Sequence, residues 1–203
     1  NALLKSFQTL KSVYDEKAFS SVTLNKTLTF CTGQDRALIT KIVYGVLDND
    51  IKLTYLISKF VKKMPKGDAL LYLKIGAYCL IDLSIPVYAV VNDVAELSKL
   101  SADRRIVGFV NATLKRMASE NVRNFDDYPQ DFVQGNAVRY SYPEWAFKKL
   151  IKDYGKDEAL KIISSNADNR TTARFVTPKT AEQIKSTYGC EAEPTILPNV
   201  FYL

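Results

Sequence analysis

The sequence contains no histidine among its 203 residues. Histidine is the most common general base near neutral pH and a frequent zinc ligand. Its absence leaves Asp, Glu, Lys, Cys and Tyr as the side chains with which this chain could perform acid–base or metal chemistry.

Cysteine is also scarce, and only Cys31, Cys79 and Cys190 occur. The three lie far apart in the sequence and lack the short spacing of paired metal ligands. Cys79 falls in the most apolar segment and is predicted to be an inert core residue. So few cysteines are typical of a reducing compartment, and we expect a cytoplasmic protein.

Long apolar runs are missing as well. A membrane-spanning helix needs about 20 consecutive apolar residues. The longest near-apolar stretch, residues 70–83, is interrupted by Lys74, Gly76 and Asp82 and predicts a buried helix instead. No secretory signal opens the chain, so the sequence predicts no membrane partner.

Positive charge is abundant but unevenly distributed. Residues 1–120 hold 17 Lys and Arg against 11 Asp and Glu, whereas residues 121–203 hold 11 of each. The whole formal net charge of +6 therefore belongs to the first part. A basic first part favours a nucleic-acid partner, although a solvated lysine-rich surface would carry the same charge.

The first 120 residues are predicted to be helical almost throughout. Apolar residues recur at helical spacing in segments separated by turn-forming residues. The expected helices cover residues 2–14, 20–28, 32–47, 51–63, 68–83, 86–97 and 103–117. Six or seven helices joined by short loops predict an all-α bundle.

The pattern changes after residue 120. Residues 121–140 mix acidic, aromatic, Gly and Pro residues without a clear period, and we expect a linker there. Further helices are expected over residues 143–154, 156–165 and 180–188, and strands over residues 171–177, 195–197 and 200–203. The predicted fold class is mainly α: an all-α bundle over 1–120, then a small, truncated β-α-β segment over 141–203.

Both ends of the chain suggest a fragment. The sequence stops inside the apolar strand expected over residues 200–203, and an exposed strand edge invites aggregation. It also begins without Met. We therefore expect the parent protein to continue beyond Leu203.

The helix expected over residues 103–117 is strongly amphipathic. Ile106, Val110 and Met117 fall on one line of it, and Ser101 is placed to cap its start. The polar side chains gather on the opposite face: Arg104, Arg105, Asn111, Lys115 and Arg116. Such a face could neutralise phosphates, and a solvated helix surface would show the same pattern.

Several segments occur in the order typical of one family. They are QDRALITKIVYGVL (34–47), LKIGAYCLIDLSIPVYAVVNDVAELSKL (73–100) and VGFVNATLKRM (107–117). They resemble the NusB-like domain that opens bacterial ribosomal RNA cytosine methyltransferases of the RsmB (Sun/Fmu) type. The shared features are Asp35-Arg36, Tyr44-Gly45, Ile85-Pro86, Asn111 and Lys115-Arg116.

Two later segments resemble the same family. They are SYPEWAFKKLIKDYG (141–155) and NADNRTTARFVTP (166–178). Tyr142 stands where the family commonly has His, and Thr177 stands where it commonly has Asn. The resemblance therefore spans nearly the whole chain.

The resemblance implies that the parent is an S-adenosylmethionine-dependent 16S ribosomal RNA cytosine-C5 methyltransferase. In that family two cysteines of a later, Rossmann-like domain carry the chemistry and the cofactor binds there. This chain has neither a Gly-rich turn after a strand nor matching cysteines, so we expect no catalytic, cofactor-binding or metal-binding residue in it. The fragment alone should be inactive.

The resemblance also names the partners, which are small-subunit ribosomal RNA and the chain's own C-terminal catalytic domain. We predict RNA contacts from three groups of cations. They are Arg104, Arg105, Lys115 and Arg116 on the basic helix, Lys5 and Lys11 on the first helix, and Arg170 and Arg174 beside the first expected strand. Trp145 is expected to anchor the second domain, and Asn92 and Asn111 to fix helix packing.

Two other functions remain open from the sequence. One is a non-enzymatic NusB-like RNA-binding factor that regulates transcription by antitermination, although such a factor would end near Glu120. The other is a helical protein-interaction module with an incidental charge. Salt-dependent binding to ribosomal RNA would separate the second of these from the RNA-binding functions.

Overall fold

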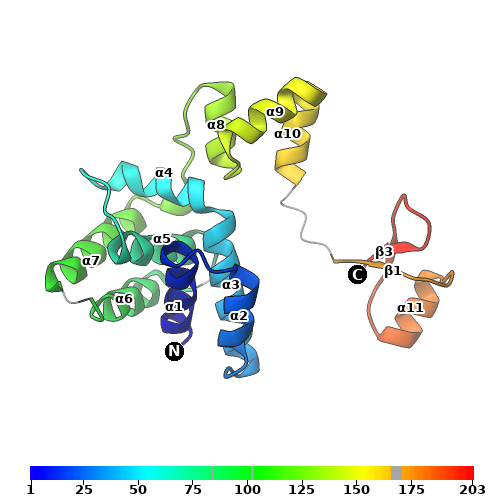
Figure 1. Ribbon diagram of the computed structural model, residues 1–203, viewed down its shortest axis with the longest axis horizontal. Helices are drawn as coiled ribbons and strands as arrows, with labels where there is room; N and C mark the ends of the chain where they lie inside the picture. The colour runs from blue at the N-terminus through cyan, green and yellow to red at the C-terminus, as the bar shows by residue number, and fades with distance from the viewer. Residues whose placement is uncertain (84, 102, 166–170) are drawn as a thin grey trace. The chain divides into compact units, whose positions relative to one another are not determined.

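The computed structural model describes residues 1–83, 85–101, 103–165 and 171–203. The chain divides into two compact units, Asn1–Asp153 and Tyr154–Leu203. The expected fold class, an all-α bundle followed by a small α/β segment, is confirmed (Figure 1). In the parts of the chain just given, no helix is both long and apolar enough to cross a membrane.

The bundle of the first unit is built around one central helix. Its helices are α1 (Ala2–Asp15), α2 (Ser20–Leu28), α3 (Gly33–Asp48), α4 (Asp50–Phe60), α5 (Asp68–Asp82), α6 (Val87–Ser98) and α7 (Arg104–Ser119). Helix α5 packs against α1, α3, α4, α6 and α7 (Figure 1). Leu73, Ile75 and Ala77 are fully buried, because α5 is apolar on nearly every side and a helix of that kind is stable only when surrounded.

Residues 121–140 are ordered on the bundle, which differs from the linker expected there. Val122–Asn124 form a 3₁₀ helix, η1, in which Arg123 reaches back to the C-terminal end of α5. The Arg123 guanidinium donates hydrogen bonds to the carbonyl oxygens of Leu80 at 2.7 Å and Leu83 at 2.9 Å. Carbonyls at a helix end have no partner within the helix, so Arg123 satisfies two of them.

Aromatic contacts hold the rest of this segment. The rings of Phe125 and Tyr128 meet edge to face at 5.4 Å, and both pack against Tyr55 of α4. Helix α8 (Phe132–Arg139) follows and also packs on α4. These residues show no periodicity in the sequence because the contacts that order them come from α4 and not from a repeating face of their own.

Ser141 connects the turn before α9 (Glu144–Tyr154) to α4. Its backbone is left-handed, with a φ of 52°. Its Oγ accepts hydrogen bonds from the backbone N–H groups of Ile51 at 3.1 Å and Lys52 at 3.5 Å. The N-cap residue of α4, Asn49, makes no side-chain cap hydrogen bond. The first turn of α4 is therefore capped by a residue 90 positions further along the chain.

The second unit combines helices with a small sheet. Its elements are α10 (Lys156–Ser164), β1 (Thr172–Arg174), α11 (Ala181–Tyr188), β2 (Glu193–Pro194) and β3 (Val200–Tyr202). The strand order is β1-β3-β2, and both pairs are antiparallel. The expected β-α-β order is present, with β3 inserted between the first two strands.

The prediction of a strand over residues 195–197 is wrong in its position. The strand lies at Glu193–Pro194 instead, and Thr195 begins a turn in which its Oγ1 accepts a hydrogen bond from the N–H of Leu197 at 3.1 Å. Asn199 closes this turn with a φ of 60°. A β-branched run can form a turn when a threonine hydroxyl satisfies the backbone locally, because that hydrogen bond competes with strand pairing.

Candidate nucleic-acid interface

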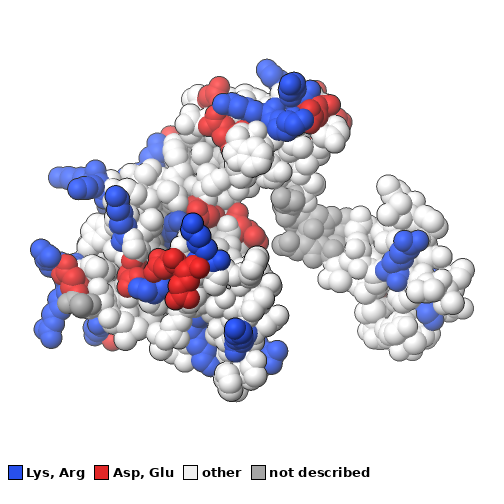
Figure 2. All heavy atoms as spheres, viewed as in Figure 1, with Lys and Arg blue, Asp and Glu red and all other residues white. Residues whose placement is uncertain are grey.

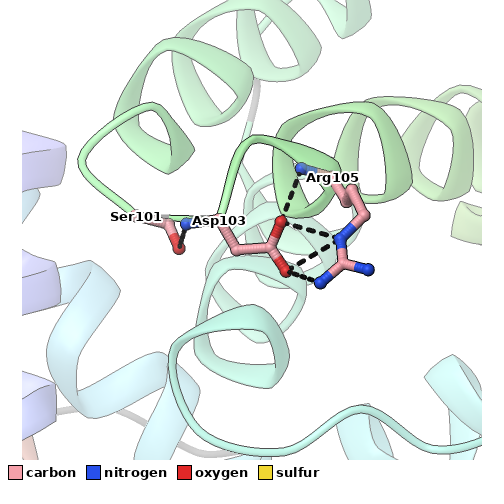
Figure 3. A network of polar contacts seen from close by, with 3 residues as sticks. All are labelled: Ser101, Asp103 and Arg105. Carbon is pink, nitrogen blue, oxygen red and sulfur yellow. Dashed lines mark hydrogen bonds and ion pairs between the residues drawn. The ribbon is translucent and has the colours of Figure 1, made fainter.

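Helix α7 begins at a cap formed by Asp103. The Asp103 carboxylate accepts hydrogen bonds from the backbone N–H of Arg105 at 3.0 Å and from its guanidinium at 2.9–3.2 Å (Figure 3). Ser101, the cap expected from the sequence, instead accepts a 3.4 Å hydrogen bond from the N–H of Asp103. That expectation was wrong because Asp103 also has a side chain suited to the N-cap position and lies directly before the first helical residue.

The Asp103 cap predicts a pH dependence for the start of α7. The hydrogen bonds from the Arg105 side chain, and then that from its backbone, hold the pKa of the Asp103 carboxyl below its usual range. The cap is therefore fully present above the ordinary aspartate pKa of about 4 and is lost as the pH falls through the lower folded-state value. NMR of the Arg105 backbone amide should show fraying only in acid, and Asp103→Ala should fray the helix already at neutral pH. Fraying in Ser101→Ala but not in Asp103→Ala would contradict this assignment.

The four cations of α7 are all exposed and lie on two lines that together span about 120° around the helix axis. Residues eleven apart on an α-helix are separated by only about 20° around the axis, and adjacent residues by about 100°. Arg104 therefore shares a line with Lys115, and Arg105 shares another with Arg116. One line faces the side of α6, where Lys115 contributes to a groove, and the other includes Arg116, which lies over the Phe60 ring of α4 at 5.5 Å.

The second line is partly neutralised within the chain. Arg105 pairs with Asp103 at 2.9 Å, and Arg116 pairs with Glu120 at 2.8 Å. Acidic side chains accordingly lie among the basic ones over this part of the surface (Figure 2). All four partners are well exposed, and exposed ion pairs contribute less than about 1 kcal/mol, so a phosphate could replace either carboxylate.

Lys115 of the first line borders a groove of about 730 Å³ between α6 and α7. Its floor is apolar, with Val91 and Ala95 from α6 and Val107 from α7. Polar side chains form the rim: Asn92, Glu96, Lys99, Asn111 and Lys115. Asn92 and Asn111, which were expected to fix helix packing, both line this groove.

The two cations predicted on α1 make contacts within the bundle. The Lys5 ammonium donates to the carbonyl oxygen of Phe30 at 3.0 Å and to Sγ of Cys31 at 3.2 Å. The Lys11 ammonium lies 2.5 Å from a carboxylate oxygen of Asp68. Both lysines are only half-exposed, so they join α1 to its neighbours, and their role as RNA contacts stays a prediction.

The two arginines predicted near the sheet belong to the second unit. Arg174 is exposed on β1, opposite Val200 of β3, and borders a shallow hollow with Phe175 and Asn199. Arg170 lies outside the described residues. Arg174 therefore belongs to a different unit from the predicted cations of α1 and α7.

Trp145 departs most from its expected place. It was expected to anchor the second domain, yet its side chain on α9 is 76% exposed. Three lysines, Lys148, Lys149 and Lys152, are exposed on the same helix and were not predicted as a site. Their spacing from Trp145 by three, four and seven residues is the signal that could have identified them, because such positions share one helix face.

Chemistry-bearing groups are sparse in the structure. Within the described parts of the chain, no three His, Cys, Asp or Glu side chains come together to hold a metal ion. Burial raises the pKa of the Cys79 thiol to about 12, which agrees with the inert core residue predicted there.

The NusB family profile matches residues 1–119, and the chain belongs to the NusB family. This match confirms the resemblance found in the sequence. A crystal structure, that of PH0851, shares the fold with a TM-score of 0.62 at 11% identity, over 98% of this chain and 48% of that one.

Curated relatives are similar beyond the NusB portion. The chain is 30% identical over 162 residues to a probable ribosomal RNA small subunit methyltransferase B of Bacillus subtilis, covering 77% of this chain and 36% of the relative. It is 27% identical over 136 residues to ribosomal RNA small subunit methyltransferase B of Escherichia coli, covering 66% and 30%. A putative methyltransferase of Mycobacterium tuberculosis is 25% identical over 176 residues, covering 81% and 38%. The chain spans about a third of the length of these relatives.

Proposed function

We propose that this chain is the RNA-recognition portion of a ribosomal RNA small subunit methyltransferase that modifies carbon-5 of a cytosine in 16S ribosomal RNA. S-Adenosylmethionine would supply the methyl group in the longer protein, outside these 203 residues. The bundle would hold ribosomal RNA through phosphate contacts, with the exposed cations of α7 as the main ones.

One observation carries this proposal: the similarity to methyltransferases named for the small-subunit ribosomal RNA extends over 162 residues, well past the NusB portion. A plain NusB-like antitermination factor does not account for similarity beyond that portion. Arg104 and Lys115 lie on the same line of α7 and form no ion pair within the described residues, so no carboxylate there competes with a phosphate for them.

Binding of ribosomal RNA by the whole chain should weaken steeply with salt. In a plot of the logarithm of the association constant against the logarithm of the salt concentration, each phosphate contact makes the slope more negative by about 0.7–0.9. Four contacts therefore give a slope near about −3. Fluorescence anisotropy with a labelled 16S ribosomal RNA fragment between about 50 and 200 mM salt measures it. The double variant Arg104→Gln/Lys115→Gln should make the slope less negative by about 1–2. It should also weaken binding to all RNA sequences alike.

The matched control removes the same charge elsewhere. Lys62→Gln/Lys63→Gln changes two exposed lysines that follow α4 and should leave the slope unchanged. Binding without salt dependence, or equal losses in the two double variants, would overturn the role of α7. No binding to ribosomal RNA at all would favour a protein-interaction module and overturn the proposed function.

A further inference from the structure

Helix α9 exposes a tryptophan among lysines. Trp145 is 76% exposed, whereas Phe147, two residues later, is completely buried and lies 6.0 Å from the ring of Phe132 in α8. The buried Phe147 fixes which side of α9 faces the rest of its unit. Trp145 therefore lies on the outer side because the packing of Phe147 fixes the rotation of α9 about its axis.

The outer side of α9 has a regular arrangement. At about 100° per residue, Lys148, Lys149 and Lys152 fall within about 60° of Trp145 around the axis. Along the axis they follow it by about 5 Å and about 10 Å. Carboxylates occur only at the margins of this face, in Glu144 and Asp153, so the ring and the ammonium groups form its centre.

The neighbours of Trp145 identify the kind of partner. A helix face that docks a protein groove presents apolar anchors at successive turns. Here every other exposed side chain on the outer face is charged, which leaves one flat ring with cations one and two turns away. An exposed aromatic ring beside basic groups is how proteins hold single-stranded nucleic acid, with a base stacked on the ring and phosphates on the cations.

We propose that Trp145, Lys148, Lys149 and Lys152 form a binding platform for single-stranded RNA, in which an unpaired base stacks on the Trp145 ring. This inference deepens the proposed function and rests on it for the identity of the nucleic acid. It makes α9 a site for unpaired RNA, whereas the phosphate contacts of α7 would form with single-stranded and double-stranded RNA alike.

The lysines of this platform are available to phosphates. Lys148 pairs with Glu144 and Lys149 pairs with Asp153, each at 2.5 Å, but every side chain in these pairs is more than a third exposed. Pairs of this kind exchange readily because water and salt screen them. Lys152 has no ion pair within the described parts of the chain.

The sequence offers a direct probe, because Trp145 is its only tryptophan. Titration of the whole chain with a short single-stranded RNA should quench the tryptophan fluorescence. Trp145→Ala should weaken binding of that strand by about 5- to 100-fold, and Trp145→Phe should keep most of the affinity because a ring remains. The same RNA presented as a perfect duplex should neither quench Trp145 nor respond to Trp145→Ala.

The matched control is Phe30→Ala, which removes another aromatic side chain that is 84% exposed. It should bind single-stranded RNA like the unchanged chain, and circular dichroism should show all variants folded. RNA binding by anisotropy with no change in Trp145 fluorescence, and no loss in Trp145→Ala, would overturn the platform but leave the proposed function standing. Absence of binding to any ribosomal RNA would overturn both.

Discussion

Replacing Asp50 with alanine is expected to lower the free energy of unfolding of the first unit by about 3 kcal/mol. The Asp50 carboxylate lies 2.5 Å from the Lys74 ammonium, whose side chain is only 8% exposed in the centre of the bundle. It also accepts a hydrogen bond from the Tyr14 hydroxyl. Without Asp50, a buried cation loses its counter-charge, and such a loss costs about 3–5 kcal/mol in a buried pair. The lower value applies because Asp50 itself is 38% exposed.

Asp68→Ala provides the control, because the lysine partner of Asp68 is much more exposed than Lys74. Asp68 is the first residue of α5 as Asp50 is the first residue of α4, and its lysine partner, Lys11, also lies at 2.5 Å. The Lys11 side chain is 43% exposed, so its pair should contribute less than about 1 kcal/mol. Urea unfolding followed by helical circular dichroism measures both variants. Equal losses would show that helix-end charge and not burial determines the effect.

A companion variant separates the lost charge from lost packing. Lys74→Met introduced with Asp50→Ala removes the unpaired cation and keeps an unbranched apolar side chain in the core. We expect this double variant to recover much of the stability lost in Asp50→Ala, because a buried ion pair can be replaced by apolar residues at little cost.

Gly45→Ala is expected to destabilise the first unit by about 1–3 kcal/mol, although alanine favours helices. A Cβ at Gly45 would lie 1.9 Å from Cζ and 2.3 Å from Oη of Tyr78, a residue of α5 that is 5% exposed. Burial is the largest cause that raises the pKa of the Tyr78 hydroxyl to about 12. To accommodate the added methyl group, either the buried Tyr78 ring must shift or α3 and α5 must separate.

Gly108 of α7 is the matched control, since it also lies inside a helix but has nothing within 4 Å of its added Cβ. Gly108→Ala should raise stability by up to about 1 kcal/mol, because glycine weakens helix interiors. Thermal unfolding of both variants should therefore give shifts of opposite sign. Shifts of the same sign would show that the contact with Tyr78 does not control the packing of α3 on α5.

Helical periodicity was sufficient to predict the bundle, because its helices bury a repeating apolar face. It could not predict the order in residues 121–140, where Arg123 and Tyr128 are held by groups far away in sequence. The Tyr44-Gly45 pair carried the family resemblance, but only the structure gives a reason for its glycine, which makes room for Tyr78.

The candidate site was predictable in part. The basic face of α7 and its two lines follow from helical periodicity, whereas the neighbouring helix that each line faces is known only from the structure. The anchoring role expected for Trp145 does not agree with its 76% exposure, which the lysines spaced around it on α9 are consistent with. The RNA contacts of these cations stay a prediction.

The cap that Ser141 supplies to α4 sets an order in time for the growing chain. The N–H group of Ile51 is synthesised 90 residues before the hydroxyl that accepts its hydrogen bond. At roughly 5–20 residues per second, the first turn of α4 waits about 5–20 s for its acceptor, with water in its place. An early helix of the bundle is thus capped by a residue near the end of the same unit. In a nascent chain that has not yet reached Ser141, the first turn of α4 lacks this cap.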